Sequence, residues 1–390
     1  VWEEWERVDK TLLVLPTGCH ALGERLLMAN GEIKAVENIE VGDQLMGPDG
    51  TSRTVLYRQE GTDTLYKIIP VKGEPFIVTG DHKLSLVRTK EKSRNLYPSD
   101  RLAGQIVDVT VEDWLKWSKW KKHIHKLFRS EKIENFKGPS KDLAIDPYFL
   151  GVILGDACLQ YEISLTTMDS VIVEEIENQC TKYGLKYRTE PAGKALSYYL
   201  SADKSKEKRN KLLDDLADLK LRGCDSYTKF VPFNYKTSSL RDRLELIAGL
   251  IDSDGSNNNN GFDFISASKQ LAKDLAFMCR SVGLAAYVKE CKKSCKDFTG
   301  TYFRVSISGN TDIVPCRVAH KKARERLQVK NVLRTGFKVE KLDAGAYVGF
   351  TVDKDNRYLL DDFTVTHNCG KTIVFSKIIE TAVKQGKRVL

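Results

Sequence analysis

The chain has 390 residues, of which 41% are hydrophobic and 29% charged, and its formal net charge is +9. This length allows two or more globular domains. No apolar run is long enough to span a bilayer, so we expect no membrane partner. The basic balance favours a polyanionic partner. Because the chain lacks an initiator Met and a signal-peptide pattern at Val1, we expect an excerpt of a longer intracellular protein.

The nine cysteines are scattered, and only Cys291 and Cys295 lie close together. No matching Cys or His pair follows them, which argues against a zinc site. Scattered free thiols are typical of a reducing compartment, so we expect the cytoplasm or the nucleus.

The first predicted element is a strand at residues 12–18, LLVLPTG, which ends in a glycine turn. Its complement lies at the other end of the chain, where residues 369–379 read CGKTIVFSKII. Joined, they give the strand, turn, Gly-Lys-Thr and helix of a loop that binds ATP phosphates. The joined segment resembles the PTGxGKT loop of superfamily-two helicases, with Leu15 where a full motif has its first glycine. This resemblance implies that ATP and Mg²⁺ would be bound by Gly18, Gly370, Lys371 and Thr372.

The segment from Cys19 to Asn368 interrupts this loop and must remove itself before the loop can form. The Cys19 thiol can attack the Gly18 carbonyl to form a thioester, and the Cys369 thiol can then take over the acyl group. The side-chain amide of Asn368 can close on its own carbonyl, with His367 placed to transfer protons. These steps require no cofactor, and they predict protein splicing.

The flanks of the interruption resemble the splicing blocks of inteins, especially those of eukaryotes and their large DNA viruses. The resemblance rests on residues 19–50 (CHALGERLL to GPDG), 78–86 (VTGDHKLSL) and 349–369 (GFTVDKDNRYLLDDFTVTHNC). It implies that Thr79 and His82 polarise and strain the first scissile peptide.

One position departs from this family pattern. Many inteins carry Asp where Gly349 falls, and that Asp helps to coordinate the first two steps. Either Asp353 or Asp361 could substitute, or the step could be tuned differently, so the role stays unassigned.

The strand pattern agrees with the resemblance. Short alternating runs separated by turns fill residues 19–110, and further strands are predicted within 337–366. The implied fold is a mainly β, horseshoe-like Hint splicing domain that is interrupted by a second domain.

Residues 112–132 contain seven Lys or Arg interleaved with Trp114, Trp117 and Trp120. The i, i+3 spacing of the tryptophans predicts one linker helix with an apolar face packed on a neighbour. The basic face either contacts DNA phosphates or is simply solvated, and the sequence does not decide between the two.

The middle of the chain contains a tandem repeat. Residues 146–159 (DPYFLGVILGDACL) and 243–256 (RLELIAGLIDSDGS) are both apolar helix patterns with small residues inside. Asp146 and Pro147 are typical of a helix start. Each pattern ends in an acidic residue, Asp156 or Asp254, and two packed helices would bring these carboxylates together to share Mg²⁺. A plain α/β domain with two buried core helices would not explain this repeated acid.

The repeat resembles the LAGLIDADG homing endonucleases, strongly at AGLIDSDG and more weakly at LGVILGDA. The resemblance implies an α+β domain with two pseudo-symmetric halves that binds double-stranded DNA as a monomer. It assigns Asp156 and Asp254 to metal binding and catalysis, and Lys229 to a basic position near the metals. Ala157 stands where Gly is usual and could crowd the metal site.

We therefore predict five segments. They are a host fragment (1–18), the first splicing part with its linker helix (19–138), the endonuclease (139–328), the second splicing part (329–368) and a second host fragment (369–390). Two alternatives remain: a splicing element with a non-cleaving, DNA-binding nuclease, and a helicase fragment whose insert stays in place.

Overall fold

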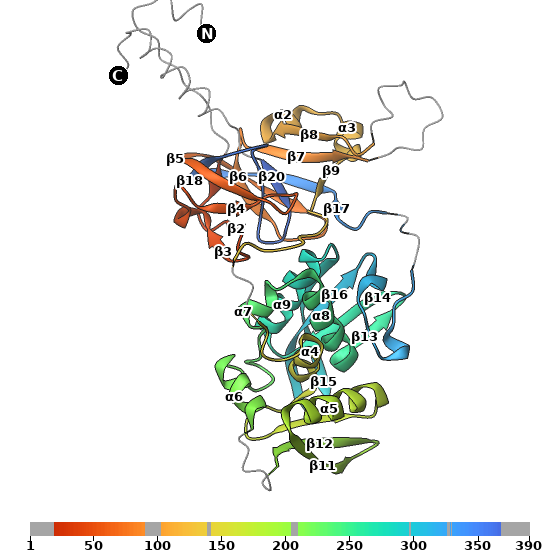
Figure 1. Ribbon diagram of the computed structural model, residues 1–390. Helices are drawn as coiled ribbons and strands as arrows, with labels where there is room; N and C mark the ends of the chain where they lie inside the picture. The colour runs from red at the N-terminus through yellow and green to blue at the C-terminus, as the bar shows by residue number, and fades with distance from the viewer. Residues whose placement is uncertain are drawn as a thin grey trace, which may run out of the picture. The chain divides into compact units, whose positions relative to one another are not determined.

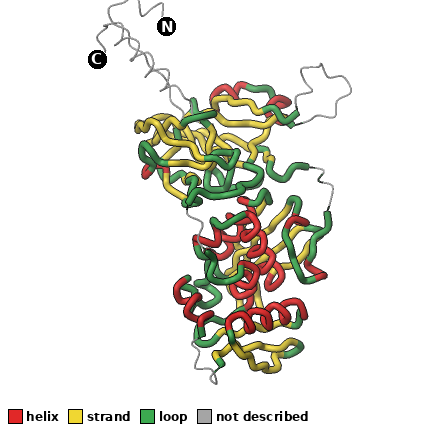
Figure 2. Tube along the Cα trace, in the orientation of Figure 1, coloured by secondary structure: helices red, strands yellow, loops and turns green. Residues whose placement is uncertain are grey.

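The structure is a computed structural model that describes residues 19–89, 103–138, 142–203, 210–295, 298–325, 328 and 330–367. The chain divides into two compact units: a first unit up to Arg129 and from Arg334 onward, and a second unit from Ser130 to Leu333. Strands dominate the first unit, and most of the helical chain lies in the second (Figures 1 and 2). None of the described helices is long and apolar enough to cross a membrane. The functional boundaries expected from the sequence stay predictions.

The first unit contains two larger sheets and one small hairpin. One sheet has the order β18-β1-β6-β5-β4, with an additional pairing of β18 and β5. Its strands are β1 (His20–Ala21), β4 (Gln44–Met46), β5 (Ser52–Pro70), β6 (Phe76–Thr79) and β18 (Phe337–Val352). The other sheet contains β7 (Lys83–Arg88), β8 (Ile106–Thr110), β9 (His125–Phe128), β17 (Arg334–Thr335), β19 (Arg357–Leu359) and β20 (Val365–His367). The hairpin joins β2 (Arg25–Leu27) to β3 (Ile33–Ala35), and a 3₁₀ turn, Val36–Asn38, follows.

Strands β5 and β18 are the longest elements and pair antiparallel along most of their length (Figure 1). They bring together the two parts of the sequence that flank the second unit. Alternate side chains of β5 and β18 enter one core, including Val55, Ile68, Val348, Phe350 and Val352. Burial of this apolar face stabilises the sheet, as expected for strands with one face toward a core.

The prediction of a single helix for residues 112–132 is wrong. The structure has two short helices, α2 (Val111–Lys116) and α3 (Lys119–Ile124), followed by β9. The break occurs because Ser118 adopts an extended conformation and caps α3 by accepting a hydrogen bond from the Lys121 backbone.

The tryptophans of this segment do not share one buried face. Trp114 is buried, whereas Trp120 is 49% exposed. The ammonium groups of Lys121 and Lys122 lie over the rings of Trp117 and Trp114, at 3.9 and 4.6 Å from the ring centroids. Contact of this basic segment with DNA stays a prediction.

The second unit has two similar halves, each opened by an apolar helix. The first half contains α4 (Pro147–Asp156), β10 (Ile163–Thr167), α5 (Ser170–Tyr183), β11 (Leu185–Ala192), β12 (Ala195–Ala202) and α6 (Lys211–Asp218). The second contains α8 (Leu240–Asp254), β13 (Gly255–Asn258), β14 (Gly261–Ser266), α9 (Lys269–Ser281), β15 (Ala285–Cys295) and β16 (Phe298–Ser308). The short α7 (Phe233–Lys236) precedes α8, and two 3₁₀ turns follow β16, at Thr311–Ile313 and Ala319–Lys321. Their sheets have the orders β10-β12-β11 and β13-β14-β16-β15, which confirms the predicted duplication.

Helices α4 and α8 pack backbone against backbone at two glycines. A Cβ on Gly151 would lie 2.4 Å from the Leu246 carbonyl oxygen, and one on Gly249 would lie 2.1 Å from the Tyr148 carbonyl oxygen. Only glycine permits this approach. The predicted seam of small residues is therefore confirmed, as is the helix start at Pro147 with its Asp146 cap.

Candidate functional sites

The first candidate site surrounds Cys19, whose side chain is fully buried. Strand β1, which follows Cys19 directly, pairs with β6 on one side and β18 on the other. The backbone N–H of Cys19 donates to Thr79 Oγ1 over 3.0 Å, and the Thr79 N–H donates back to the Cys19 carbonyl over 3.0 Å. The Thr79 hydroxyl in turn donates to Asp81 over 2.7 Å. Thr79 therefore holds the peptide nitrogen at which the predicted first step breaks the chain.

The side of Cys19 that faces β18 has no room for a side chain. A Cβ on Gly349 would lie 2.1 Å from Cys19 Sγ. The two carboxylates considered as substitutes for the usual Asp are engaged at other positions. Asp353 accepts a hydrogen bond from the Thr54 backbone over 3.0 Å, and Asp361 forms an ion pair with Arg25 at 3.7 Å.

His82 connects the Cys19 side of the site to the last described strand. Its Nε2 shares a hydrogen bond of 2.7 Å with Thr366 Oγ1, next to His367. Its Nδ1 has no hydrogen-bond partner among the described residues. Burial, followed by the proximity of His20 and His367, holds the pKa of His82 well below its usual range. His82 is therefore a neutral imidazole whose second nitrogen remains available for a proton transfer.

A second buried histidine, His20, was not found from the sequence. Its ring meets that of His82 edge to face, with centroids 4.7 Å apart, and its Nε2 shares a hydrogen bond of 2.7 Å with the Tyr358 hydroxyl. Burial lowers the pKa of His20 to about 3. The only local signal was its position directly after the predicted nucleophile.

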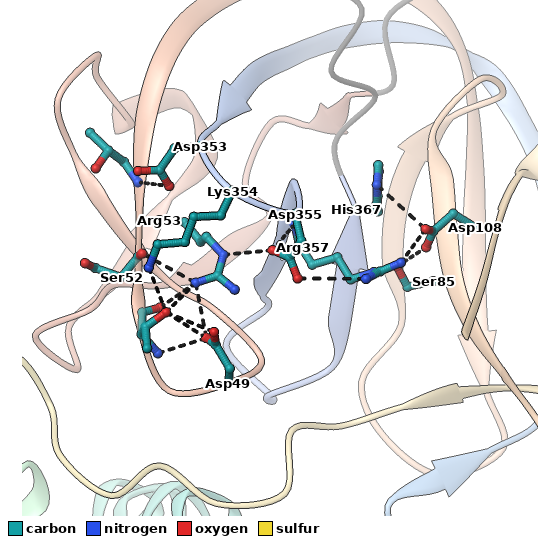
Figure 3. Close-up of polar contacts among 12 residues, drawn as sticks. Asp49, Ser52, Arg53, Ser85, Asp108, Asp353, Lys354, Asp355, Arg357 and His367 are labelled. Carbon is teal, nitrogen blue, oxygen red and sulfur yellow. Dashed lines mark hydrogen bonds and ion pairs between the residues drawn. The ribbon is translucent and has the colours of Figure 1, made fainter. Parts of the chain in front are cut away.

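His367 closes β20 and lies beside a chain of charged groups that Figure 3 shows. Its Nε2 is 3.8 Å from Asp108 Oδ2. Burial lowers the pKa of His367 to about 4, although Asp108 acts in the opposite direction. The ring is therefore neutral at physiological pH, with its Nδ1 unpartnered among the described residues.

Asp108 is itself held by two donors. The Ser85 hydroxyl donates to Asp108 Oδ1 over 2.6 Å, and Arg357 Nη2 donates to Oδ2 over 2.5 Å. Partial burial favours the neutral acid, but these hydrogen bonds outweigh it and lower the pKa of Asp108. The series of ion pairs continues from Arg357 to Asp355, at 3.8 Å, and from Asp355 to Arg53, at 2.9 Å (Figure 3).

The remaining predicted residues of the splicing and phosphate sites lie outside the described part of the chain. The structure therefore places Cys19 and His367, which lie at or next to the two ends of the interruption, but it does not describe the scissile peptides. The residues concerned are Gly18, Asn368, Cys369, Gly370, Lys371 and Thr372.

The second candidate site lies where α4 and α8 end. Asp156 and Asp254 are the last residues of the two helices, and both reach solvent. Desolvation by the surrounding protein and repulsion by Asp156 raise the pKa of Asp254 to about 6. The pKa of Asp156 is also raised by desolvation, against the effect of nearby lysines. The two carboxylates therefore lie close enough to repel each other, and a shared cation would relieve the repulsion.

Two buried lysines flank these carboxylates in equivalent positions. Lys229 donates to the carbonyl oxygens of Ile153 and Gly155 at the end of α4, over 3.2 and 3.3 Å. Lys321 donates to those of Asp252 and Ser253 at the end of α8, over 2.7 and 2.8 Å. Ammonium groups here complement the helix C-termini. Lys321 was missed because its separation from Lys229 does not match the spacing of the repeat.

Ala157 imposes no backbone strain at the end of α4, and the crowding of the metal site expected from it stays a prediction. It caps α4 with φ −80° and ψ 143°, a conformation that any residue adopts, and its side chain is buried. Its counterpart after α8, Gly255, is also extended, with φ −84°.

The residues fit a divalent cation as a two-carboxylate site. Asp oxygens are the ligands that Mg²⁺ prefers, and this ion commonly keeps several waters and binds substrate phosphates. Across the residues that the structure describes, no group of three or more His, Cys, Asp or Glu could hold a metal alone. Other ligands would thus come from water and a bound phosphate.

Two family models match the chain. Residues 19–141 match the Hom_end-associated Hint family, and residues 242–317 match the LAGLIDADG-like domain family. The chain carries a Hint domain and a LAGLIDADG domain. Its fold is accordingly a mainly β Hint domain interrupted by an α+β LAGLIDADG domain, as the sequence predicted.

Similar proteins include one curated relative and two kinds of solved structure. The catalytic subunit of the V-type proton ATPase from Candida tropicalis is 37% identical over 89 residues, a match that covers 20% of this chain and 8% of that protein. A mesophilic variant of the homing endonuclease I-DmoI is 12% identical, with a TM-score of 0.30, over 42% of this chain and 88% of that chain. The gp41-1 intein is 21% identical, with a TM-score of 0.16, over 24% of this chain and 80% of that chain. TM-scores this low do not establish a common fold.

Proposed function

We propose that residues 19–368 excise themselves and join Gly18 to Cys369. One observation carries the proposal. Reciprocal hydrogen bonds of Thr79 hold Cys19, and the His82–Thr366 hydrogen bond joins the same turn to the end of the interruption. Cys19 and Thr366, which lie near the two ends of the interruption, thereby contact side chains of the same turn.

The first step is an N-to-S acyl shift. The Cys19 thiolate attacks the Gly18 carbonyl carbon, the C–N bond breaks, and the Cys19 nitrogen takes up a proton. Thr79 Oγ1 accepts a hydrogen bond from that nitrogen and so keeps it in place. The neutral His82, with a free Nδ1, serves as the proton carrier.

The later steps use the other junction. The Cys369 thiolate displaces Cys19 from the thioester, which forms a branched chain. The Asn368 side-chain nitrogen then attacks its own carbonyl carbon and breaks the bond to Cys369, whose nitrogen takes a proton by way of His367. A final S-to-N shift makes the Gly18–Cys369 peptide bond. A neutral His367 can accept a proton from the amide and deliver it to the departing amine.

Gel analysis of the expressed chain tests splicing. The expected products are a free insert and a ligated product of the two host fragments. Cys19→Ala combined with Asn368→Ala should abolish both. Persistence of the full-length chain, as in the alternative of a retained insert, would overturn the proposal. Normal ligation in the double variant would overturn the mechanism.

We further propose that the LAGLIDADG domain cuts double-stranded DNA at the uninterrupted host gene. Asp156 and Asp254 would hold Mg²⁺ between the helix ends, with Lys229 and Lys321 beside them. When bound, the metal would activate water and stabilise the leaving 3′ oxygen. The I-DmoI structures include complexes with target DNA and Ca, Mn or Mg, which supports this choice of ligands. Both halves belong to one chain, so we infer a monomer.

Plasmid cleavage tests the nuclease. A plasmid with the intein-less junction should be cut once in the presence of Mg²⁺ and not in the presence of EDTA. Binding without cutting would favour the alternative of a non-cleaving remnant.

We also propose that the host is an intracellular ATPase, helicase-like in its PTGxGKT loop. The loop would bind ATP-Mg through Gly18, Gly370, Lys371 and Thr372 only after splicing. The match to a proton ATPase subunit spans 89 residues, more than either host fragment contains, so the proposal for the host rests on the PTGxGKT loop. ATP binding by the ligated product, and none by the double variant, is the expected result.

A further inference from the structure

Gln59 lies beside the Cys19 thiol, and neither the sequence pattern nor the family resemblance gives it a role. Its side-chain amide donates a hydrogen bond from Nε2 to Cys19 Sγ over 3.6 Å. Gln59 belongs to β5, where it stands directly opposite Gly349 of β18. The ladder between the two long strands therefore fixes the amide relative to the sulfur.

Gly349 provides the space for this contact. A Cβ at residue 349 would lie 2.1 Å from Cys19 Sγ and 3.3 Å from Gln59 Nε2. Any side chain there would displace the thiol, the amide or both. The bare backbone of one strand and the amide of the facing strand thus form a single arrangement around the sulfur.

We propose that Gln59 is a catalytic residue of the first splicing step, which it assists by holding the Cys19 sulfur and favouring its thiolate. The inference rests on the proposed splicing function. An N–H donor stabilises an anionic sulfur more than a neutral thiol. The same contact aims the sulfur, which forms a C–S bond to the Gly18 carbonyl carbon while the C–N bond breaks and the Cys19 nitrogen takes the proton.

Substitutions of Gln59 test the proposal in an Asn368→Ala parent, where the acyl group of Gly18 stays in a thioester to Cys19 or Cys369. The readout is the rate of hydroxylamine cleavage after Gly18. Gln59→Leu keeps bulk but removes the donor, and we expect it to slow cleavage about tenfold, as for one hydrogen bond to a charged group. Gln59→Glu keeps the shape but places an anion beside the sulfur, and we expect a larger loss at neutral pH. Thr62→Leu, at an exposed position of β5, is the matched control and should leave the rate unchanged.

The relative cleavage rates of the two Gln59 variants distinguish a role in the reaction from a role in packing alone. If Gln59 only packs, the isosteric Glu should be closer to the parent than Leu, and that result would overturn the proposal, as would an unchanged Leu variant. Folding is checked in a Cys19→Ala background, where cleavage after Asn368 should proceed at the parental rate in both variants. An unreactive Asn368→Ala parent would overturn splicing itself, whereas a reactive parent with unaffected variants overturns this inference alone.

Discussion

At the scale of single residues, the two buried lysines of the LAGLIDADG domain lead to a specific prediction on DNA cleavage. Each ammonium caps one helix end and lies near both carboxylates. Lys321→Met should therefore lower DNA cleavage about 10- to 100-fold, like Lys229→Met, because a charged hydrogen bond is lost beside the metal site. Lys322→Met, an exposed neighbour, is the matched control. Cleavage that falls equally in the control would contradict the prediction, and circular dichroism would report on folding.

The buried histidines of the Hint domain lead to a prediction on how the stability of the domain depends on pH. Their pKa values in the folded state, about 3 for His20 and about 4 for His367, lie below the usual 6.5. The unfolded chain thus binds more protons below pH 6.5, and stability is full above that pH and falls as pH drops toward 4. The free energy of unfolding should fall by about 1.4 kcal/mol per histidine for each pH unit. Urea denaturation of the Cys19→Ala, Asn368→Ala variant at pH 7 and pH 5 measures this, and His20→Gln should reduce the slope.

At the scale of elements, Asp108 on β8 reaches His367 on β20 because both strands pair with β7. Its carboxylate, fixed by Ser85 and Arg357, favours the tautomer with a proton on Nε2 and a free Nδ1. Asp108→Asn should therefore slow cleavage after Asn368 about tenfold in a Cys19→Ala background, and should move its pH profile. Asp113→Asn, on the exposed face of α2, is the control. Thioester formation in an Asn368→Ala background should be unaffected, and an equal loss there would point to a general structural effect.

The elements also show what the sequence could predict. Helices α4 and α8 were found with their glycine seam and their terminal acids, and α4 also with its Asp146 cap, because those signals are local. The Ser239 cap of α8 was not predicted. The contacts of Gln59, Asp108 and Lys321 were not found. Each depends on strand pairing or on a contact between residues that are far apart in the sequence. The linker segment was misread because the spacing of its tryptophans matched a helix, while the Ser118 cap and the β9 pairing with β7 took precedence.

At the scale of the whole molecule, the two candidate sites belong to separate compact units, each with its own core. The hydrogen bonds described above for the Cys19 site come from residues of the first unit, and those of Lys229 and Lys321 at the Asp156 and Asp254 site come from residues of the second. Asp156→Asn with Asp254→Asn should therefore abolish DNA cleavage and leave the rate of splicing unchanged. Cys19→Ala with Asn368→Ala should block splicing and leave cleavage of the intein-less plasmid within about twofold. Gel assays of both reactions on the same preparations measure the coupling, and a large loss of splicing in the nuclease variant would show that the units depend on each other.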